Sequence, residues 1–173
     1  MFDINNPVSY LEFSNVLTTI NTIKKIITNP KQLYYARKLA EIALRNVPDY
    51  VHDEELAGIL DWVKKHFRYT RDIKGTELVK TVEKMYNEIL THKKFIGDCD
   101  DVSTLIAAML ISIGYPVRLV IISTSNNVKD TYNHIFVQGY NKTKKVWRNL
   151  DGTLFKKGFN AIVPYKKIKF FSV

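Results

Sequence analysis

Apolar residues recur every three or four positions through the first half of the chain, which predicts a series of helices. Two of these follow the pairs Asn6–Pro7 and Asn29–Pro30, in which asparagine suits the N-cap and proline the first helical position. A third predicted helix, residues 53–69, begins with acidic residues and ends with basic ones, as the helix dipole favours. Residues 76–91 are a fourth candidate. The N-terminal half is therefore expected to be helical.

A fifth and more apolar helix is predicted from Cys99 to Ile113. Asp98 suits its N-cap, and Asp101, three positions on, makes an acidic variant of a capping box. Gly114 suits the C-terminal end. The wide apolar face of this helix predicts a central, buried position.

Strand patterns follow in the last third of the chain. The β-branched run 117–124 predicts a buried strand, and the alternating segments 132–140 and 145–151 predict a hairpin. Residues 125–130 are expected to form a loop, and the tail 153–173 to add one or two strands. Helices followed by an antiparallel sheet indicate an α+β fold.

With 173 residues and 46% hydrophobic content, the chain is long enough for one packed domain. We divide it into an N-terminal helical extension, residues 1–50, and a domain, residues 51–173. The single cysteine excludes an internal disulfide, which suits a reducing compartment. The longest apolar run, residues 105–113, is half the length that a bilayer requires, and residues 1–10 lack the layout of a secretory signal. We therefore expect the protein in the cytoplasm or within a viral particle.

The net charge of +9 is concentrated near the C-terminus. Residues 140–173 contain nine Lys or Arg and one acid, Asp151, so they carry +8 and leave +1 for the first 139 residues. Such a segment can contact nucleic acid or an acidic protein. Alternatively, these are solvated lysines on outer strand faces that block edge pairing, which the absence of a recognised nucleic-acid motif favours.

Cys99, the only thiol, lies where a helix is expected to begin. The unpaired N–H groups and the dipole of a helix N-terminus stabilise a thiolate, and the same amides can hold an oxyanion. Cys99 is therefore a candidate nucleophile. The alternative is that it is a small buried residue that only fills space.

A base for this thiol must come from the four histidines. His52, His66 and His92 lie near predicted helix ends and look like solvated surface groups, whereas His134 lies in an apolar strand. Asp151 ends the next strand, so the two side chains can meet across the hairpin and the carboxylate can hold the imidazole tautomer. Alternatively, the histidine is structural and the aspartate, which precedes a glycine, belongs to an ordinary turn.

Three aspartates surround Cys99. We expect Asp98 and Asp101 to cap the helix, and Asp100 to face water or a positive group of the substrate. Their charge opposes a thiolate, but we expect the ion pair with His134 to outweigh it and lower the thiol pKa. The chain has no CxxC or HxxxH pair for zinc and no loop of the calcium-binding kind, so we expect no metal and no cofactor.

Residues 56–153 resemble a transglutaminase-like domain of the cysteine-protease-like superfamily, which includes transglutaminases and related bacterial and phage peptidases or amidases. The resemblance is carried by LDWVKKHFRYTRD, GDCDDVSTLIAAMLISIGYPVRLV, YNHIFVQ and VWRNLDGT, and GDCDD with its helix is the most specific part. It implies a papain-like arrangement with the cysteine at the N-terminus of the central helix. The catalytic roles of the family then fall on Cys99, His134 and Asp151.

The resemblance implies a thiol enzyme that acts on amide bonds of a protein or peptide, as a peptidase or amidase or by transglutaminase-type acyl transfer. The alternative is a non-catalytic module of the same fold, a structural or assembly protein such as a phage virion component.

Overall fold

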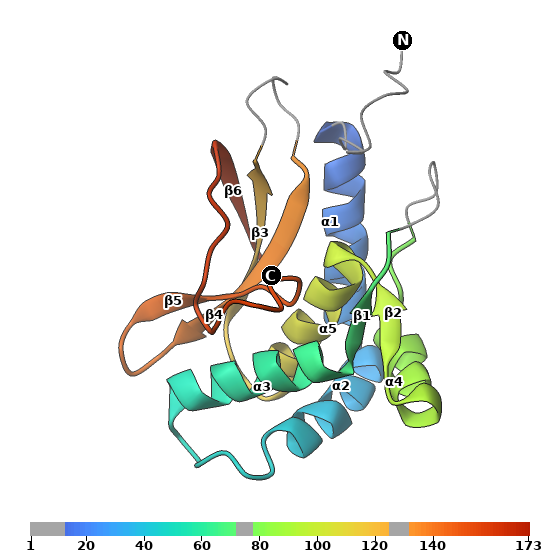
Figure 1. The fold of residues 1–173 in the computed structure, drawn as a ribbon, viewed down its shortest axis with the longest axis vertical. Coiled ribbons are helices and arrows are strands. Elements are labelled where there is room, and N and C mark those ends of the chain that lie inside the picture. The colour runs from blue at the N-terminus through green and yellow to red at the C-terminus, as the bar shows by residue number, and fades with distance from the viewer. Residues whose placement is uncertain (1–12, 72–77, 125–131) are drawn as a thin grey trace.

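The computed structural model describes residues 13–71, 78–124 and 132–173. Within these ranges the chain forms the following elements in order: α1 (Phe13–Ile27), α2 (Pro30–Ala43), α3 (His52–His66), β1 (Phe67–Tyr69), α4 (Val82–His92), β2 (Phe95–Gly97), α5 (Cys99–Ser112), β3 (Val117–Ser123), β4 (His134–Asn141), β5 (Val146–Leu150) and β6 (Lys167–Ser172) (Figure 1). The predicted helix start at Asn6–Pro7 and the predicted loop 125–130 lie outside the described residues.

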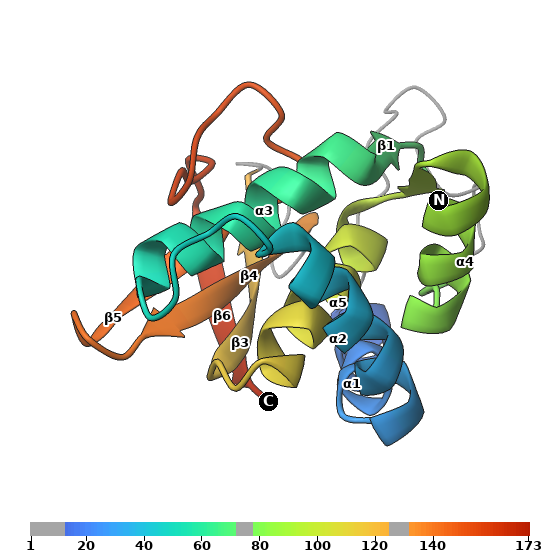
Figure 2. The same ribbon diagram turned by 90° about the horizontal axis from the view of Figure 1, so that it is seen from below.

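The larger sheet has the strand order β5-β4-β3-β6, and every neighbouring pair is antiparallel. Helix α5 lies between this sheet and the helices α1 and α2, as both views of the ribbon show (Figures 1 and 2). The predicted α+β fold is therefore confirmed, with the cysteine helix at its centre.

Burial of α5 explains its composition. Every residue from Asp100 to Leu110 is buried, because the helix contacts the sheet on one side and other helices around the rest of its surface. Ile20 of α1 and Leu39 of α2 belong to the same hydrophobic core as Leu105 of α5. The division of the chain at residue 50 stays a prediction.

The second Asn-Pro helix start is confirmed in detail. The side chain of Asn29 accepts hydrogen bonds from the backbone N–H groups of Lys31 at 2.9 Å and Gln32 at 3.4 Å, and Pro30 is the first residue of α2. Asparagine at this position satisfies N–H groups that have no partner within the helix.

The third helix ends earlier than predicted. Instead of continuing to Tyr69, the chain becomes extended after His66 and forms β1, which pairs in parallel with β2. The ring of Phe67 packs against Phe95 of β2 at a centroid distance of 5.0 Å. This long-range contact holds the three residues in strand geometry, which the basic end of the helix did not indicate.

The predicted hairpin is present with a defined register. Val137 pairs with Leu150 and Asn141 pairs with Val146, so the start of β4 and the end of β5 lie at the same end of the sheet. The tail contributes one strand, β6, which pairs with β3 rather than with the hairpin.

Part of the basic segment is structural. Arg148 donates two hydrogen bonds to Asp53 of α3, each at 2.9 Å, and the Nζ of Lys144 contacts the same carboxylate at 2.7 Å. Lys142 Nζ donates to the carbonyl of Gly114 at 2.9 Å. Three of the nine basic residues therefore attach the hairpin to the helical layer.

Among the described residues, none of the helices combines the length and apolar composition needed to cross a membrane.

Candidate active site

Cys99 is the first residue of α5 and is partly exposed. The side chain of Asp98 accepts the backbone N–H of Asp100 at 3.3 Å, which confirms Asp98 as the N-cap. The thiol therefore lies at the N-terminal end of the buried helix, where backbone N–H groups are available to an anion.

His134 and Asp151 meet at the end of the hairpin. The Nε2–H of His134 donates to Oδ2 of Asp151 at 2.6 Å. The other carboxylate oxygen, Oδ1, accepts the backbone N–H of Thr153 at 3.0 Å and its hydroxyl at 2.7 Å. Burial would raise the pKa of Asp151, but the hydrogen bond and charge of His134, with the two hydrogen bonds from Thr153, outweigh burial and hold that pKa below its usual value.

The start of β4 lies against the first turns of α5. The hydroxyl of Ser103 donates to the carbonyl of Ile135 at 3.3 Å, and the backbone of Ile135 forms a hydrogen bond with the sulfur of Cys99. The sulfur is thus beside the residue that follows His134. Among the described residues, no hydrogen bond joins the thiol to the imidazole itself.

The expected low thiol pKa is wrong for this arrangement. Burial raises the pKa of Cys99 well above its ordinary value, and the charges of Asp100, Asp98 and Asp151 act in the same direction. Only the hydrogen bond from Ile135 acts in the opposite direction. The direction of this shift favours the protonated thiol.

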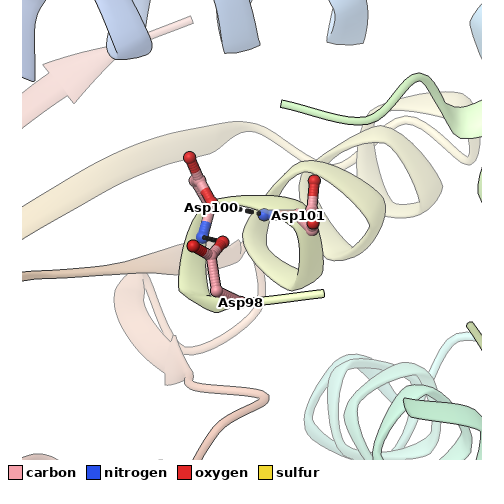
Figure 3. Close-up of side chains that lie close together, drawn as sticks. All are labelled: Asp98, Asp100 and Asp101. Carbon is pink, nitrogen blue, oxygen red and sulfur yellow. Dashed lines mark hydrogen bonds between the residues drawn. The ribbon is translucent and has the colours of Figure 1, made fainter. Parts of the chain in front are cut away.

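The prediction that Asp100 faces water is also wrong, because its side chain, in the first turn of α5 (Figure 3), is buried. The alternative, that it meets a positive group of the substrate, stays a prediction. Its Oδ1 accepts the backbone N–H of Asp101 at 3.1 Å. Burial, followed by the hydrogen bond and charge of Asp98 and the charge of Asp101, raises the pKa of Asp100 to about 10. Asp100 therefore carries a proton at neutral pH, where its charge does not act on Cys99.

Asp101 joins α5 to the chain before α4. Its Oδ1 accepts the backbone N–H of Lys80 at 2.7 Å, a contact between residues 21 positions apart. Gly97 makes room for this carboxylate, since a Cβ there would lie 2.3 Å from its Oδ2. Asp101 thus has a long-range role that a capping box does not include.

The same three aspartates are the set of described residues that can hold a cation, because their carboxylate oxygens lie within 4.8 Å of one another. One oxygen of this set, Oδ1 of Asp101, already accepts from the backbone N–H of Lys80. The expectation of no metal stays a prediction.

Within the described part of the chain, the other three histidines make no contact with Cys99, His134 or Asp151. His92 is exposed, as predicted. His52 and His66 are half-buried and have partners, which corrects their description as solvated groups: Nδ1 of His52 is 3.2 Å from the hydroxyl of Thr143, and Nδ1 of His66 is 2.8 Å from the carbonyl of Trp62.

Two residues of the site were not predicted from the sequence. Thr153 supports Asp151, and its signal was the Asp-Gly-Thr order, which is typical of an aspartate that accepts hydrogen bonds from the residue two positions on. Tyr69 ends β1 opposite Gly97, and burial together with the charges of Cys99 and Asp98 raises its pKa. No local pattern marked Tyr69, because the parallel pairing of β1 and β2 brings it to the site.

The comparison with protein families agrees with this geometry. Residues 37–152 match the profile described as the Transglutaminase-like superfamily. The chain belongs to this superfamily. No curated protein is similar enough in sequence to count as a match.

Solved structures with the same fold are distant in sequence. A structure of Rad4–Rad23 bound to a 6-4 photoproduct UV lesion has 15% identity and a TM-score of 0.54 over 86% of this chain and 39% of that chain. A putative protease from Parabacteroides distasonis has 13% identity and a TM-score of 0.54 over 78% and 26% of the two chains. This transglutaminase-like chain thus spans well under half the length of either, and the likeness concerns the fold.

Proposed function

We propose that this protein is a thiol enzyme that acts on amide bonds of a protein or peptide substrate, with Cys99 as nucleophile, His134 as general base and acid, and Asp151 as the group that orients His134. The observation that carries the proposal is the 2.6 Å hydrogen bond between His134 Nε2 and Asp151 Oδ2. It engages Nε2 and leaves Nδ1 of the imidazole to exchange a proton with the thiol. Membership of the superfamily and the position of Cys99 at a helix N-terminus support it.

The raised thiol pKa determines how the first step proceeds. The sulfur of Cys99 attacks the carbonyl carbon while its proton passes to Nδ1 of His134, so deprotonation accompanies attack and does not precede it. A C–S bond forms, and the backbone N–H groups in the first turn of α5 hold the oxyanion. Collapse of this intermediate breaks the C–N bond, and the imidazolium returns its proton to the leaving amine.

The acyl-thioester is then attacked by water or by an amine, which regenerates the thiol and releases an acid or a new amide. Hydrolysis and acyl transfer share all earlier steps. We favour hydrolysis, in the manner of a peptidase or amidase.

An activated ester tests the proposal without knowledge of the natural substrate. p-Nitrophenyl acetate should release a burst of nitrophenol and transiently acetylate Cys99, which mass spectrometry can locate because the chain has a single cysteine. The burst should disappear in Cys99→Ala and be about 100-fold slower in His134→Ala, a typical contribution of general-base catalysis. His92→Ala, which changes an exposed histidine outside the site, is the matched control. Equal rates in wild type and His134→Ala would contradict the proposal.

A second candidate is a module of the same fold that binds or assembles without turnover, such as a structural component of a phage particle. The raised pKa of Cys99 favours it, because an unreactive thiol needs no activation. The similar Rad4–Rad23 structure is one bound to a 6-4 photoproduct UV lesion, and the putative protease is named for catalysis, so fold likeness does not discriminate between the two candidates. A stable stoichiometric complex with a protein or nucleic acid, together with no ester burst, would favour the module.

A further inference from the structure

Three aromatic rings contact one another where β1 pairs with β2, the strand that leads into α5: Phe67, Tyr69 and Phe155, which we call the aromatic wall. The ring of Phe155 stacks on Phe67 with a centroid distance of 5.7 Å and an interplanar angle of 14°. Tyr69 meets Phe67 edge-on at 6.3 Å. Phe67 is buried, whereas Tyr69 is 42% exposed and Phe155 is 49% exposed. The wall therefore has a fixed base and two accessible rings.

Strand pairing brings Tyr69 to the thiol. Tyr69 is opposite Gly97 in the parallel pair, and the N–H of Thr70 donates to the Gly97 carbonyl at 2.7 Å. Gly97 is two residues before Cys99. Residues two apart on a strand share a face, so Tyr69 lies on the same side of the small sheet as Phe67. The electrostatic influence of Cys99 on the Tyr69 hydroxyl agrees with this proximity.

Phe155 reaches Phe67 from the segment that follows β5. It follows Asp151 by four residues, in a series of turns in which its N–H donates to the Thr153 carbonyl at 3.0 Å. The far end of these turns is fixed to α3, because Nζ of Lys64 donates to the Lys157 carbonyl at 2.8 Å. A half-exposed phenylalanine is thus held in one position beside the residue that orients His134.

We infer that Tyr69 and Phe155 receive an apolar side chain of the substrate next to the amide bond that Cys99 attacks. The inference rests on the proposed function and adds a substrate class to it: peptides with an aromatic or large aliphatic residue at the scissile amide. Exposed rings on a fixed base bind such a group at a low cost in conformational entropy. Acidic side chains are disfavoured there, because Asp98 and Asp151 already place negative charge beside the thiol.

Alkylation of Cys99 by two reagents tests the wall separately from turnover. With iodoacetamide and with N-benzyliodoacetamide the sulfur forms a C–S bond, displaces iodide and loses its proton, but only the second reagent carries an aromatic ring. The measured quantity is the ratio of their rate constants in the folded protein, divided by the same ratio for the chain unfolded in urea. We expect this quotient to exceed unity several-fold in the wild type and to fall towards unity in both Phe155→Ala and Tyr69→Ser.

Phe170→Ala is the matched control, because Phe170 is 47% exposed and packs over Arg118 on β3, in the larger sheet. It should leave the quotient unchanged. A wild-type quotient at or below unity, a quotient that neither wall variant lowers, or an equal fall in Phe170→Ala would overturn the inference. Failure of the proposed function has a different signature, namely no His134-dependent burst with p-nitrophenyl acetate while the quotient remains high.

Discussion

The hydroxyl of Thr153 donates to Oδ1 of Asp151, which precedes it by two positions, at 2.7 Å. The other oxygen of this carboxylate, Oδ2, accepts from His134. Thr153→Val keeps the shape of the side chain and removes this donor. Because the bond lowers the pKa of Asp151, its loss should raise that pKa and move the acidic limb of the burst rate to higher pH. The free energy of unfolding should fall by about 1 kcal/mol.

The lowered pKa of Asp151 also determines how the free energy of unfolding depends on pH. A carboxyl whose folded pKa is depressed stabilises the protein above its unfolded pKa, and this stabilisation is lost as the pH falls through the folded value. Thr28→Val is the matched control, because it removes a hydroxyl that also donates at 2.7 Å but lies on an exposed turn at the end of α1. A pH profile that stays fixed in Thr153→Val, with only stability reduced, would limit Thr153 to a structural role.

Asp100→Asn should make the thiol of Cys99 more acidic. In the pH range where the thiol titrates, Asp100 is losing its own proton, and its charge then raises the pKa of Cys99. The variant should therefore shift the ultraviolet thiolate titration to lower pH and speed alkylation above about pH 9, with little change at pH 7. Glu54→Gln, an exposed acid on α3, is the control. An unshifted titration would contradict the assigned charge interaction.

Asp100 should also make the protein less stable as the pH rises. Its folded pKa of about 10 lies above that of an unfolded aspartate, so the stability it contributes is complete below about pH 4 and decreases from there up to about pH 10. Urea unfolding at about pH 5 and about pH 8 measures this slope. We expect a flatter dependence in Asp100→Asn than in the wild type. An equal change in the free energy of unfolding with pH in the two proteins would mean that Asp100 is ionised in the folded protein.

Gly152→Ala should disturb the site through packing. A Cβ at this position would lie 2.4 Å from Cγ2 of Val102 on α5, so the segment that carries Asp151 must shift. Overpacking of this kind costs about 1–3 kcal/mol, and we expect a slower burst as well. Gly158→Ala is the matched control, since its Cβ would meet nothing within 4 Å. Thermal unfolding and burst rates equal to those of the control would contradict the prediction.

Asp53→Asn should loosen the attachment of the hairpin to α3. The carboxylate accepts from Arg148, Lys144 and Asn141, and these contacts hold its pKa well below the usual value. The variant should lose about 1–2 kcal/mol, between the values of exposed and buried ion pairs, and the difference should shrink as the pH falls below about 4. Glu41→Gln, which breaks the exposed pair with Arg37, should change stability by less than about 0.5 kcal/mol.

Local patterns predicted the cap at Asn29, the start of α5 at Cys99 and the hairpin, because each depends on residues close together in the chain. The hairpin also indicated that His134 and Asp151 can come close, but the register, with Val137 opposite Leu150, could not be fixed from sequence. The strand at Phe67–Tyr69 has no local pattern of its own, since only pairing with β2 distinguishes it from the end of a helix; it was indicated only by the resemblance, in which LDWVKKHFRYTRD is a helix followed by a strand.

Burial was the harder quantity to predict. Asp100 was expected to be solvated because aspartate usually is, and nothing in its neighbours indicates that the start of α5 is covered on that side. The prediction of a low pKa for the Cys99 thiol failed for the same reason, since desolvation is the largest cause of the rise in that pKa. The sign of such a shift depends on the finished packing, which sequence spacing does not contain.

The place of β6 in the sheet has a consequence for association between chains. β6 pairs with the side of β3 that β4 leaves open. Without β6, one edge of the apolar strand β3 would be exposed, and such an edge is a template for association with other chains. Lys167 and Lys169, which pair opposite Ser123 and Ile121, place charge along the border that β6 forms instead. β6 is thus the strand that protects the sheet from self-association.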